Sequence, residues 1–219
     1  MTVAADSHIR PVEQSQPPAA RTRLLIVDDH AAVRAGLREL LDDEPDFEVV
    51  DAVDGAEAAM TVAEREPIDV AVVDYQLGSR NGLWLSRKLK RLPSPPAVLI
   101  YSAYADGVLA AAAVVAEADA LVSKGGLGSE LRDEIRRVAW GGSGLRPLPE
   151  WLGDTIRARY GPEEQAIFGM LLAGIAPSEI ARTLELSDAG LESRLGAMLR
   201  KLQMPYHQQR LVDGIDDAA

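Results

Sequence analysis

Cysteine is absent from the 219 residues of this chain, and that absence excludes disulfides and thiolate chemistry. Histidine is scarce as well. The three histidines, His8, His30 and His207, lie far apart and show no metal-ligand spacing such as H-E-x-x-H. We therefore interpret His30 as a surface residue at the start of a helix rather than as a ligand.

Long apolar runs are also missing. The longest, about residues 108–116, is rich in alanine and far too short to span a bilayer. The first twenty residues have no apolar signal-peptide core, and their Gln and Pro content predicts a disordered N-terminal arm over 1–21. From these absences we expect a cytoplasmic protein that does not contact a membrane.

Acidic residues outnumber basic ones, and the formal net charge is −11. Such a balance favours solubility and argues against indiscriminate attraction to nucleic acid or anionic membranes. Otherwise the composition is ordinary for a globular protein, with 47% hydrophobic and 26% charged residues. The length allows one large domain or two modest ones.

Polar residues follow four short apolar runs. Runs 24–27, 70–73, 97–101 and 120–122 lead into Asp28 and Asp29, Asp74, Ser102, and Lys124 respectively. If the runs are parallel strands, these five side chains gather at the carboxyl edge of one sheet, where open α/β sheets place their sites. Three carboxylates, a hydroxyl and an ammonium suit a divalent metal and a phosphoryl group.

Strand and helix patterns alternate from Arg23 to about Trp140. We expect strands at 24–27, 47–50, 70–73, 97–101 and 120–122, and helices at 31–41, 55–65, 83–92, 108–116 and 129–140. Prolines at 45, 67 and 93 end three of these segments. This alternation predicts an α/β fold with a parallel sheet covered on both faces.

A linker-like segment rich in Gly and Pro follows, and beyond it we find no strand signal. Helices are expected at 163–173, 178–184 and 188–202. Pro177 suits the first turn of the second helix, and Ser187 can cap the third. Two short helices joined by a tight turn predict a helix-turn-helix in a small all-α domain.

Residues 22–142 resemble the receiver domain of bacterial two-component response regulators, and the segment from Leu25 to Leu37 is similar to the NarL/FixJ subfamily. The resemblance implies a flavodoxin-like, five-stranded receiver. Asp74 would be the phospho-acceptor, with Ser102 and Lys124 contacting the phosphoryl group. Mg²⁺ would be held by the carboxylates Asp28, Asp29 and Asp74, and by a backbone carbonyl near Gln76.

Two positions depart from the receiver pattern. Gly78 stands where a proline is expected, four residues after the acceptor, which predicts a looser loop. Leu121 stands where a switch aromatic is expected, three residues before the lysine. Whether phospho-switching survives Leu121 is left open, and Tyr104 is a candidate steric substitute.

Residues 156–212 resemble the LuxR-type helix-turn-helix domain, with 143–155 as the linker and 213–219 as an acidic tail. The matching positions are Glu164, Leu171, Gly174, Glu179, Ile180, Ala181, Leu184, Leu186, Ser187, Leu191, Arg200, Lys201 and Leu202. In such a domain the helix from Asp188 would enter the major groove. Phosphate contacts would come from Arg182, Arg194, Arg200 and Lys201. A final helix at 206–215 would support dimerisation.

The charge of this region is unusual for a DNA-binding module. From Asp154 to the end there are ten acidic and seven basic residues, a balance of 7 − 10 = −3. DNA-binding modules usually carry a basic footprint. The positions usually held by threonine, a base and histidine on the recognition helix are Gly190, Glu192 and Arg194 here. Glu192 would face DNA, and Gly190 weakens the helix.

Together these features predict a response regulator that a sensor histidine kinase phosphorylates on Asp74. The modified protein would dimerise and bind DNA to change transcription. An alternative is a phospho-dependent protein-interaction regulator whose diverged helix-turn-helix does not bind DNA in the usual way. A third hypothesis, an aspartate-nucleophile phosphohydrolase, lacks its second aspartate, because Gln76 occupies that position. Since a receiver transfers phosphate only onto itself, we do not expect an enzyme.

Overall fold

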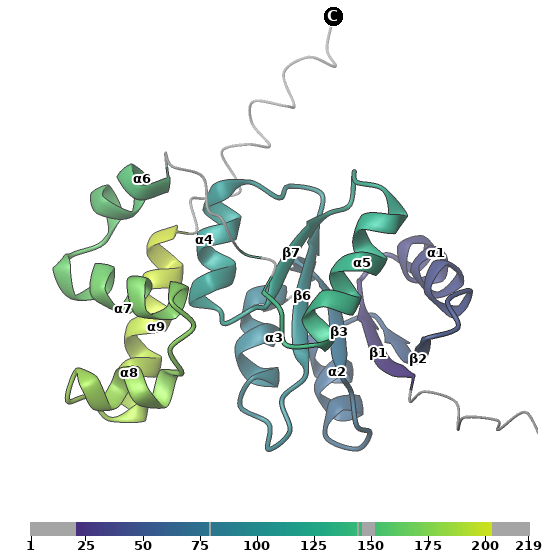
Figure 1. Ribbon diagram of the computed structural model, residues 1–219, viewed down its shortest axis with the longest axis horizontal. Coiled ribbons are helices and arrows are strands. Elements are labelled where there is room, and N and C mark those ends of the chain that lie inside the picture. The colour runs from purple at the N-terminus through teal and green to yellow at the C-terminus, as the bar shows by residue number, and fades with distance from the viewer. Residues whose placement is uncertain (1–20, 79, 144, 146–151, 203–219) are drawn as a thin grey trace, which may run out of the picture.

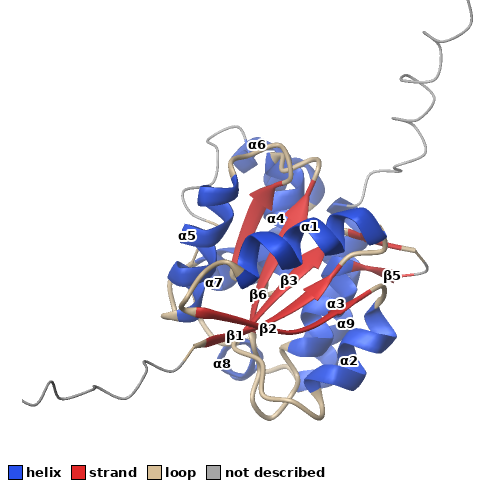
Figure 2. Ribbon diagram, turned by 90° about the vertical axis from the view of Figure 1, so that its right-hand side faces the viewer, coloured by secondary structure: helices blue, strands red, loops and turns tan. Residues whose placement is uncertain are grey.

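The five predicted strands form one parallel sheet. The computed structural model describes residues 21–78, 80–143, 145 and 152–202. The strands are β1 (Thr22–Val27), β2 (Phe47–Val53), β3 (Val70–Asp74), β6 (Ala97–Ser102) and β7 (Ala120–Ser123). Their order in the sheet is β2-β1-β3-β6-β7, which is the flavodoxin-like arrangement. The predicted fold class is therefore confirmed (Figure 2).

Helices cover both faces of the sheet because successive strand residues point to opposite sides. Leu24 and Ile26 pack with α1 (Ala31–Asp42) and α5 (Gly128–Ala139) on one face. The opposite face of the sheet is covered by α2 (Ala56–Ala63), α3 (Gly82–Leu89) and α4 (Gly107–Val115). Both faces of β1 and β3 are buried, which explains their unbroken apolar sequences.

Two elements were not predicted from the sequence. A small antiparallel hairpin, β4 (Gln76–Leu77) and β5 (Arg80–Asn81), follows β3. Gly78 lies in its turn with φ 59°, in the left-handed region that favours glycine. The looser loop that we inferred from Gly78 is thus a paired hairpin. Helix α6 (Leu152–Arg159) begins inside the predicted linker.

The C-terminal part of the chain is helical, as predicted. It contains α7 (Pro162–Leu172), α8 (Pro177–Thr183) and α9 (Asp188–Leu202). Ser187 accepts a hydrogen bond from the backbone N–H of Gly190 at 3.1 Å, as expected of a helix cap. The predicted helix 206–215, the acidic tail and residues 1–20 lie outside the described residues. The domain boundaries remain a prediction.

Helix α4 joins the two parts of the molecule. Its sequence is apolar on every side, and a helix of that kind is normally buried all round. One side packs on the sheet, and the other contacts α7 and α9 (Figure 1). The apolar core therefore continues from the sheet into the helical part. In the described part of the chain, no helix combines the length and apolarity needed to cross a membrane.

Candidate functional site

Four of the predicted pocket residues lie at the carboxyl ends of neighbouring strands. Asp28 follows β1, Asp74 ends β3, Ser102 ends β6 and Lys124 follows β7. Parallel register sets these ends side by side, because Val27 pairs with Val73 and Asp74 with Tyr101. Asp28, Asp74 and Ser102 are buried polar residues, which distinguishes this edge from the apolar core.

The ammonium of Lys124 bridges two of the carboxylates. Its Nζ lies 2.6 Å from Oδ2 of Asp28 and 3.0 Å from Oδ2 of Asp74. The two carboxylates come from different strands and would repel each other without this cation. The lysine thus holds both carboxylate oxygens close together at the carboxyl edge of the sheet.

The electrostatic environment shifts the pKa values of two pocket residues. Burial raises the pKa of Asp74 above its ordinary value, and the hydrogen bond from Lys124 opposes that shift. For Lys124, burial lowers the pKa, but the hydrogen bonds to Asp28 and Asp74 outweigh burial and raise it. The ammonium therefore keeps its charge at neutral pH. The Asp74 carboxyl holds its proton to a higher pH than an exposed aspartate.

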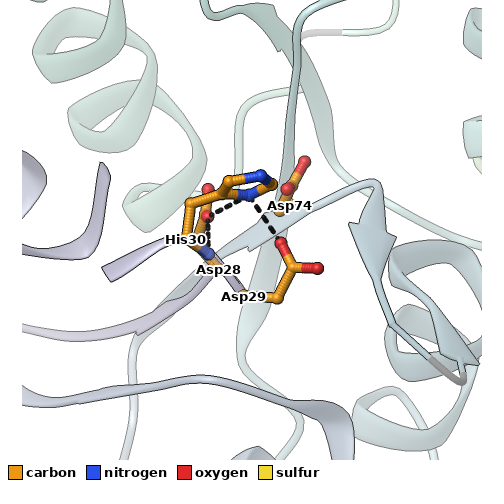
Figure 3. Close-up of side chains that lie close together, drawn as sticks. All are labelled: Asp28, Asp29, His30 and Asp74. Atoms are coloured by element: carbon orange, nitrogen blue, oxygen red, sulfur yellow. Dashed lines mark hydrogen bonds and ion pairs between the residues drawn. The ribbon is translucent and has the colours of Figure 1, made fainter. Parts of the chain in front are cut away.

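A third carboxylate, that of Asp29, and the imidazole of His30 lie beside Asp28 and Asp74 (Figure 3). Ligand atoms of Asp28, Asp29, His30 and Asp74 all lie within 4.8 Å of one another. His30 Nδ1 is 2.7 Å from Oδ1 of Asp29, and the His30 backbone N–H donates to Asp28 at 2.8 Å. His30 occupies the N-cap position of α1 and is largely exposed, as predicted, yet it borders the acidic cluster.

The hydroxyl of Ser102 is engaged in a local turn. It accepts a hydrogen bond from the backbone N–H of Tyr104 at 3.1 Å. Tyr104 is 58% exposed and follows the strand end, outside the core. Ser102 is therefore in the pocket wall, with its hydroxyl directed by the β6–α4 connection.

Leu121 is half-buried in β7 and packs against the apolar cluster that includes α4. The aromatic ring beside the pocket lysine comes from a different residue, Tyr101 on β6. Lys124 Nζ lies 5.7 Å from the centroid of that ring. Sequence reasoning missed this contact, because Tyr101 looked like an ordinary strand residue.

Gly82 packs so closely against the backbone of Asp74 that no side chain fits at that position. A Cβ atom added at Gly82 would lie 2.3 Å from the backbone oxygen of Asp74. Asn81, just before it, caps α3 by accepting from the backbone N–H of Trp84 at 2.9 Å. Gln76, whose carbonyl we predicted as a ligand, gives a backbone hydrogen bond to the Asp74 carboxylate. The Asn-Gly pair at residues 81 and 82, at the start of an apolar helix, was the sequence signal that could have predicted the helix cap and the close packing against Asp74.

The four basic residues predicted to bind DNA lie elsewhere, in the helical part. Three of them pair with glutamates of that part. Arg194 lies 2.8 Å from Glu163, Lys201 2.6 Å from Glu164 and Arg182 3.8 Å from Glu179. Arg200 is exposed, and no ion pair of it is found in the described regions. The structure does not gather these four cations into one patch with unpaired charge.

Glu192 is placed differently from our expectation. It was predicted to face DNA from the recognition helix, but its carboxylate contacts Arg87 in α3 and Arg91 in the turn after α3. Glu192 is therefore half-buried between the helical part and the sheet domain. Gly190, the other unusual position, is half-buried beside the Ser187 cap.

Comparison with known protein families gives one match over the sheet domain. Residues 24–136 match the model of the response regulator receiver domain. The matched segment starts within β1 and ends within α5, so it contains every residue of the pocket described above.

Curated relatives match along most of the chain. The nitrate/nitrite response regulator protein NarP of Escherichia coli is 28% identical over 86% of this chain and 92% of its own length. The DNA-binding transcriptional activator DevR/DosR of Mycobacterium tuberculosis is 29% identical over 87% of this chain and 92% of its own. Both matches extend past the sheet domain into the helical part.

Solved structures show the same fold. A LuxR-family two-component response regulator from Aurantimonas aligns with a TM-score of 0.55 and 25% identity, over 64% of this chain and 99% of that one. A complex of the response regulator RcsB with DNA aligns with a TM-score of 0.56 over 89% of this chain and 99% of that one. At 19% identity the second likeness concerns the fold alone.

Proposed function

The chain belongs to the family of response regulators with a receiver domain, and from that premise we propose that Asp74 is its phospho-acceptor. The observation that supports this assignment is the bridge from Lys124 to both Asp28 and Asp74 at the sheet edge. This bridge places a positive charge next to Asp74, where a phosphoryl group on that residue would carry negative charge. Lys124 would then pair with the new phosphoryl oxygens.

The reaction we propose transfers one phosphoryl group. A carboxylate oxygen of Asp74 attacks phosphorus, and a mixed anhydride bond forms. The bond from phosphorus to the donor breaks, and the donor leaves with its electron pair. The donor is a sensor histidine kinase or a small acyl phosphate. Ser102 donates its hydroxyl hydrogen to a phosphoryl oxygen once it leaves its local turn. Orientation and charge neutralisation account for most of the catalysis.

The acidic cluster fits Mg²⁺. Its donors are hard carboxylate oxygens with an exposed side that leaves room for water ligands, which Mg²⁺ retains readily. Asp28, Asp29 and Asp74 would hold the ion, with the backbone carbonyl of Gln76 completing the protein ligands. The ion supplies positive charge that offsets the repulsion between the incoming phosphoryl group and the carboxylates.

Mg²⁺ affinity is expected to depend on pH. Asp74 must be deprotonated to bind the ion, and burial raises the pKa of this carboxyl. Below that pKa the affinity should fall by about tenfold for each pH unit. Calorimetric titration from pH 8 down to pH 3.8, the ordinary pKa of an aspartate, measures this. Asp54→Asn is the control, because Asp54 is exposed and lies outside the cluster. An affinity that stays constant down to pH 3.8 would contradict the assignment.

We further propose that phosphorylation drives homodimerisation and DNA binding by the helical domain, and so controls transcription. Support comes from relatives that match along nearly the whole chain, one of them named as a DNA-binding activator. Arg182, Arg194, Arg200 and Lys201 would contact phosphates. Three of them would have to exchange a glutamate partner for a phosphate.

Arg200 offers the sharpest test of the DNA contacts. Arg200→Ala should weaken binding to all sequences and reduce the slope of log affinity against log salt by about 1, since one phosphate contact is lost. Electrophoretic or anisotropy titrations across a salt series give that slope. Arg65→Ala removes an exposed arginine from the receiver and should leave the slope unchanged. Equal slopes for the two variants would rule out a phosphate contact by Arg200.

The second candidate function is phospho-dependent binding to another protein. The glutamate partners of Arg182, Arg194 and Lys201 favour it, because cations already neutralised within the domain attract DNA less. Binding to genomic fragments discriminates between the two functions. The protein-binding function predicts no selective enrichment with or without a phosphoryl mimic.

A further inference from the structure

Lys124 reaches its two carboxylate partners across neighbouring strands. It follows β7, the last strand in the order β2-β1-β3-β6-β7, whereas Asp74 ends β3 and Asp28 follows β1 (Figure 1). Neighbouring strands lie about 4.8 Å apart. The lysine side chain must therefore pass over the end of β6 before its ammonium can contact either carboxylate. The side chains at the end of β6 decide what the lysine lies against.

The main chain at the end of β6 fixes the point from which the lysine side chain starts. The backbone N–H of Lys124 donates to the carbonyl oxygen of Ser102 at 2.8 Å. Tyr101 comes just before Ser102 in the same strand. Within the sheet Tyr101 pairs with Asp74 on β3 and with Val122 on β7. It therefore lies directly between the acceptor aspartate and the strand that leads to the lysine.

The side chain of Tyr101 lies on the α5 face of the sheet. It is half-buried and packs against the apolar cluster that contains Leu131 and Ile135 of α5. Successive strand residues point to opposite faces, so the side chain of Ser102 points to the other face. Leu121, at the position of the expected switch aromatic, packs on that other face as well. Tyr101 therefore does not occupy the place of the missing switch aromatic.

The Tyr101 ring contacts the lysine where its side chain crosses β6. Nζ of Lys124 lies 5.7 Å from the ring centroid, within the range of a cation–π interaction. The lysine side chain is only 19% exposed, so water screens this attraction weakly. Burial raises the pKa of Tyr101, and the positive charge of Lys124 opposes this shift less strongly. The phenol is therefore neutral at pH 7, and the contact comes from the ring face rather than from a phenolate charge.

We propose that Tyr101 is a positioning residue of the pocket, whose ring holds the Lys124 ammonium over the end of β6. The proposal rests on the proposed function, because it concerns how the same lysine contacts a phosphoryl group on Asp74. When Asp74 carries that group, the ammonium leaves a carboxylate oxygen for a phosphoryl oxygen. The ring stays in contact with the ammonium in both arrangements and limits how far the ammonium moves.

Three variants of the full chain separate the ring from the hydroxyl and from general stability. Tyr101→Phe keeps the ring, whereas Tyr101→Leu keeps only an apolar side chain. The matched control is Phe47→Leu, because Phe47 lies in the same apolar cluster and its ring centroid is 4.9 Å from Cζ of Arg136. Phe47 begins β2, so it lies at the amino edge of the sheet, opposite to the pocket.

The affinity for beryllofluoride in the presence of Mg²⁺ measures how well Lys124 receives a phosphoryl mimic. Tyr101→Leu should weaken this affinity by about fivefold, the size expected for the loss of one partly shielded cation–π contact. Tyr101→Phe should bind like the wild type. Phe47→Leu should also bind like the wild type, although it should unfold at a lower urea concentration. Wild-type affinity in Tyr101→Leu, or an equal loss of affinity in Phe47→Leu, would overturn the proposal.

Nuclear magnetic resonance of the Lys124 side chain tests the contact without any ligand, because an aromatic face shifts the resonances of nearby protons. The shift of the ε-methylene protons of Lys124 should disappear in Tyr101→Leu and persist in Tyr101→Phe. An unchanged shift in Tyr101→Leu would overturn the positioning role.

The two measurements distinguish this proposal from the proposed function. If the wild type does not bind beryllofluoride at Asp74, the proposed function fails, and the lysine resonances still decide whether Tyr101 positions Lys124. If the wild type binds the mimic and Tyr101→Leu binds it equally well, the positioning role fails and the proposed function stands.

Discussion

Asp74→Asn is expected to abolish labelling of the protein by an acyl phosphate. The amide has neither the charge nor the nucleophilic oxygen of the carboxylate, so no mixed anhydride can form. The measurement is intact-mass spectrometry after incubation with acetyl phosphate and Mg²⁺, in which the wild type gains one phosphoryl mass. Full labelling of the variant would show that another residue accepts the group.

Two comparisons make the Asp74→Asn result specific. Asp54→Asn changes an exposed aspartate near the same edge of the sheet and should label like the wild type. Misfolding can be excluded by thermal unfolding. Burial raises the pKa of Asp74 in the folded state, so the protonated carboxyl stabilises the fold. This contribution to the unfolding free energy is fully present below the ordinary pKa of 3.8 and is lost as pH rises through the pKa of the folded state. Asparagine stays neutral, so the variant should melt no lower than wild type at pH 7.

Gly82→Ala is expected to cost about 3 kcal/mol of unfolding free energy. The new Cβ would lie 2.3 Å from the Asp74 backbone oxygen and 3.1 Å from Cγ1 of Val73. Both belong to the buried strand β3, which cannot move without disturbing its pairing with β1 and β6. Urea unfolding measures the loss. Acyl-phosphate labelling should slow as well, since Asp74 would be displaced.

Gly36→Ala provides the matched control for Gly82→Ala. Gly36 lies within α1, and a Cβ there would meet nothing within 4 Å. Alanine in a helix interior is favoured over glycine, so this variant should be more stable by about 0.5–1 kcal/mol. If Gly82→Ala unfolded at the wild-type urea concentration, the close approach of Gly82 to Asp74 would not constrain the pocket.

The receiver was predictable because its signals are local. Four of the five strands are apolar runs that end in or lead into a polar residue, and parallel pairing brings such ends together. Asp28, Asp74, Ser102 and Lys124 could therefore be placed in one pocket from the sequence alone. The hairpin after Asp74 could not, because two-residue strands show no periodicity. Neither could the contact of Tyr101 with Lys124, because the two residues belong to different strand–helix units that meet only in the folded sheet.

The role of Glu192 could not be predicted, because its partners are distant in the chain. Arg87 precedes it by 105 residues and Arg91 by 101. From the sequence, Glu192 could be compared only with the DNA-facing residue of similar domains, where a negative charge would repel DNA. The folded structure brings Arg87 and Arg91 into contact with its carboxylate. The three intradomain pairs of Arg182, Arg194 and Lys201 depend on tertiary packing in the same way.

The most direct test of phospho-controlled DNA binding is enrichment of fragments from the organism's own genome by the purified full chain. Binding is measured with and without beryllofluoride as a phosphoryl mimic, across a salt series. We predict selective, salt-sensitive enrichment that rises with the mimic in the wild type and does not rise in Asp74→Asn. No enrichment in either state, with the mimic bound to the wild-type pocket, would contradict DNA binding and leave a protein partner as the output.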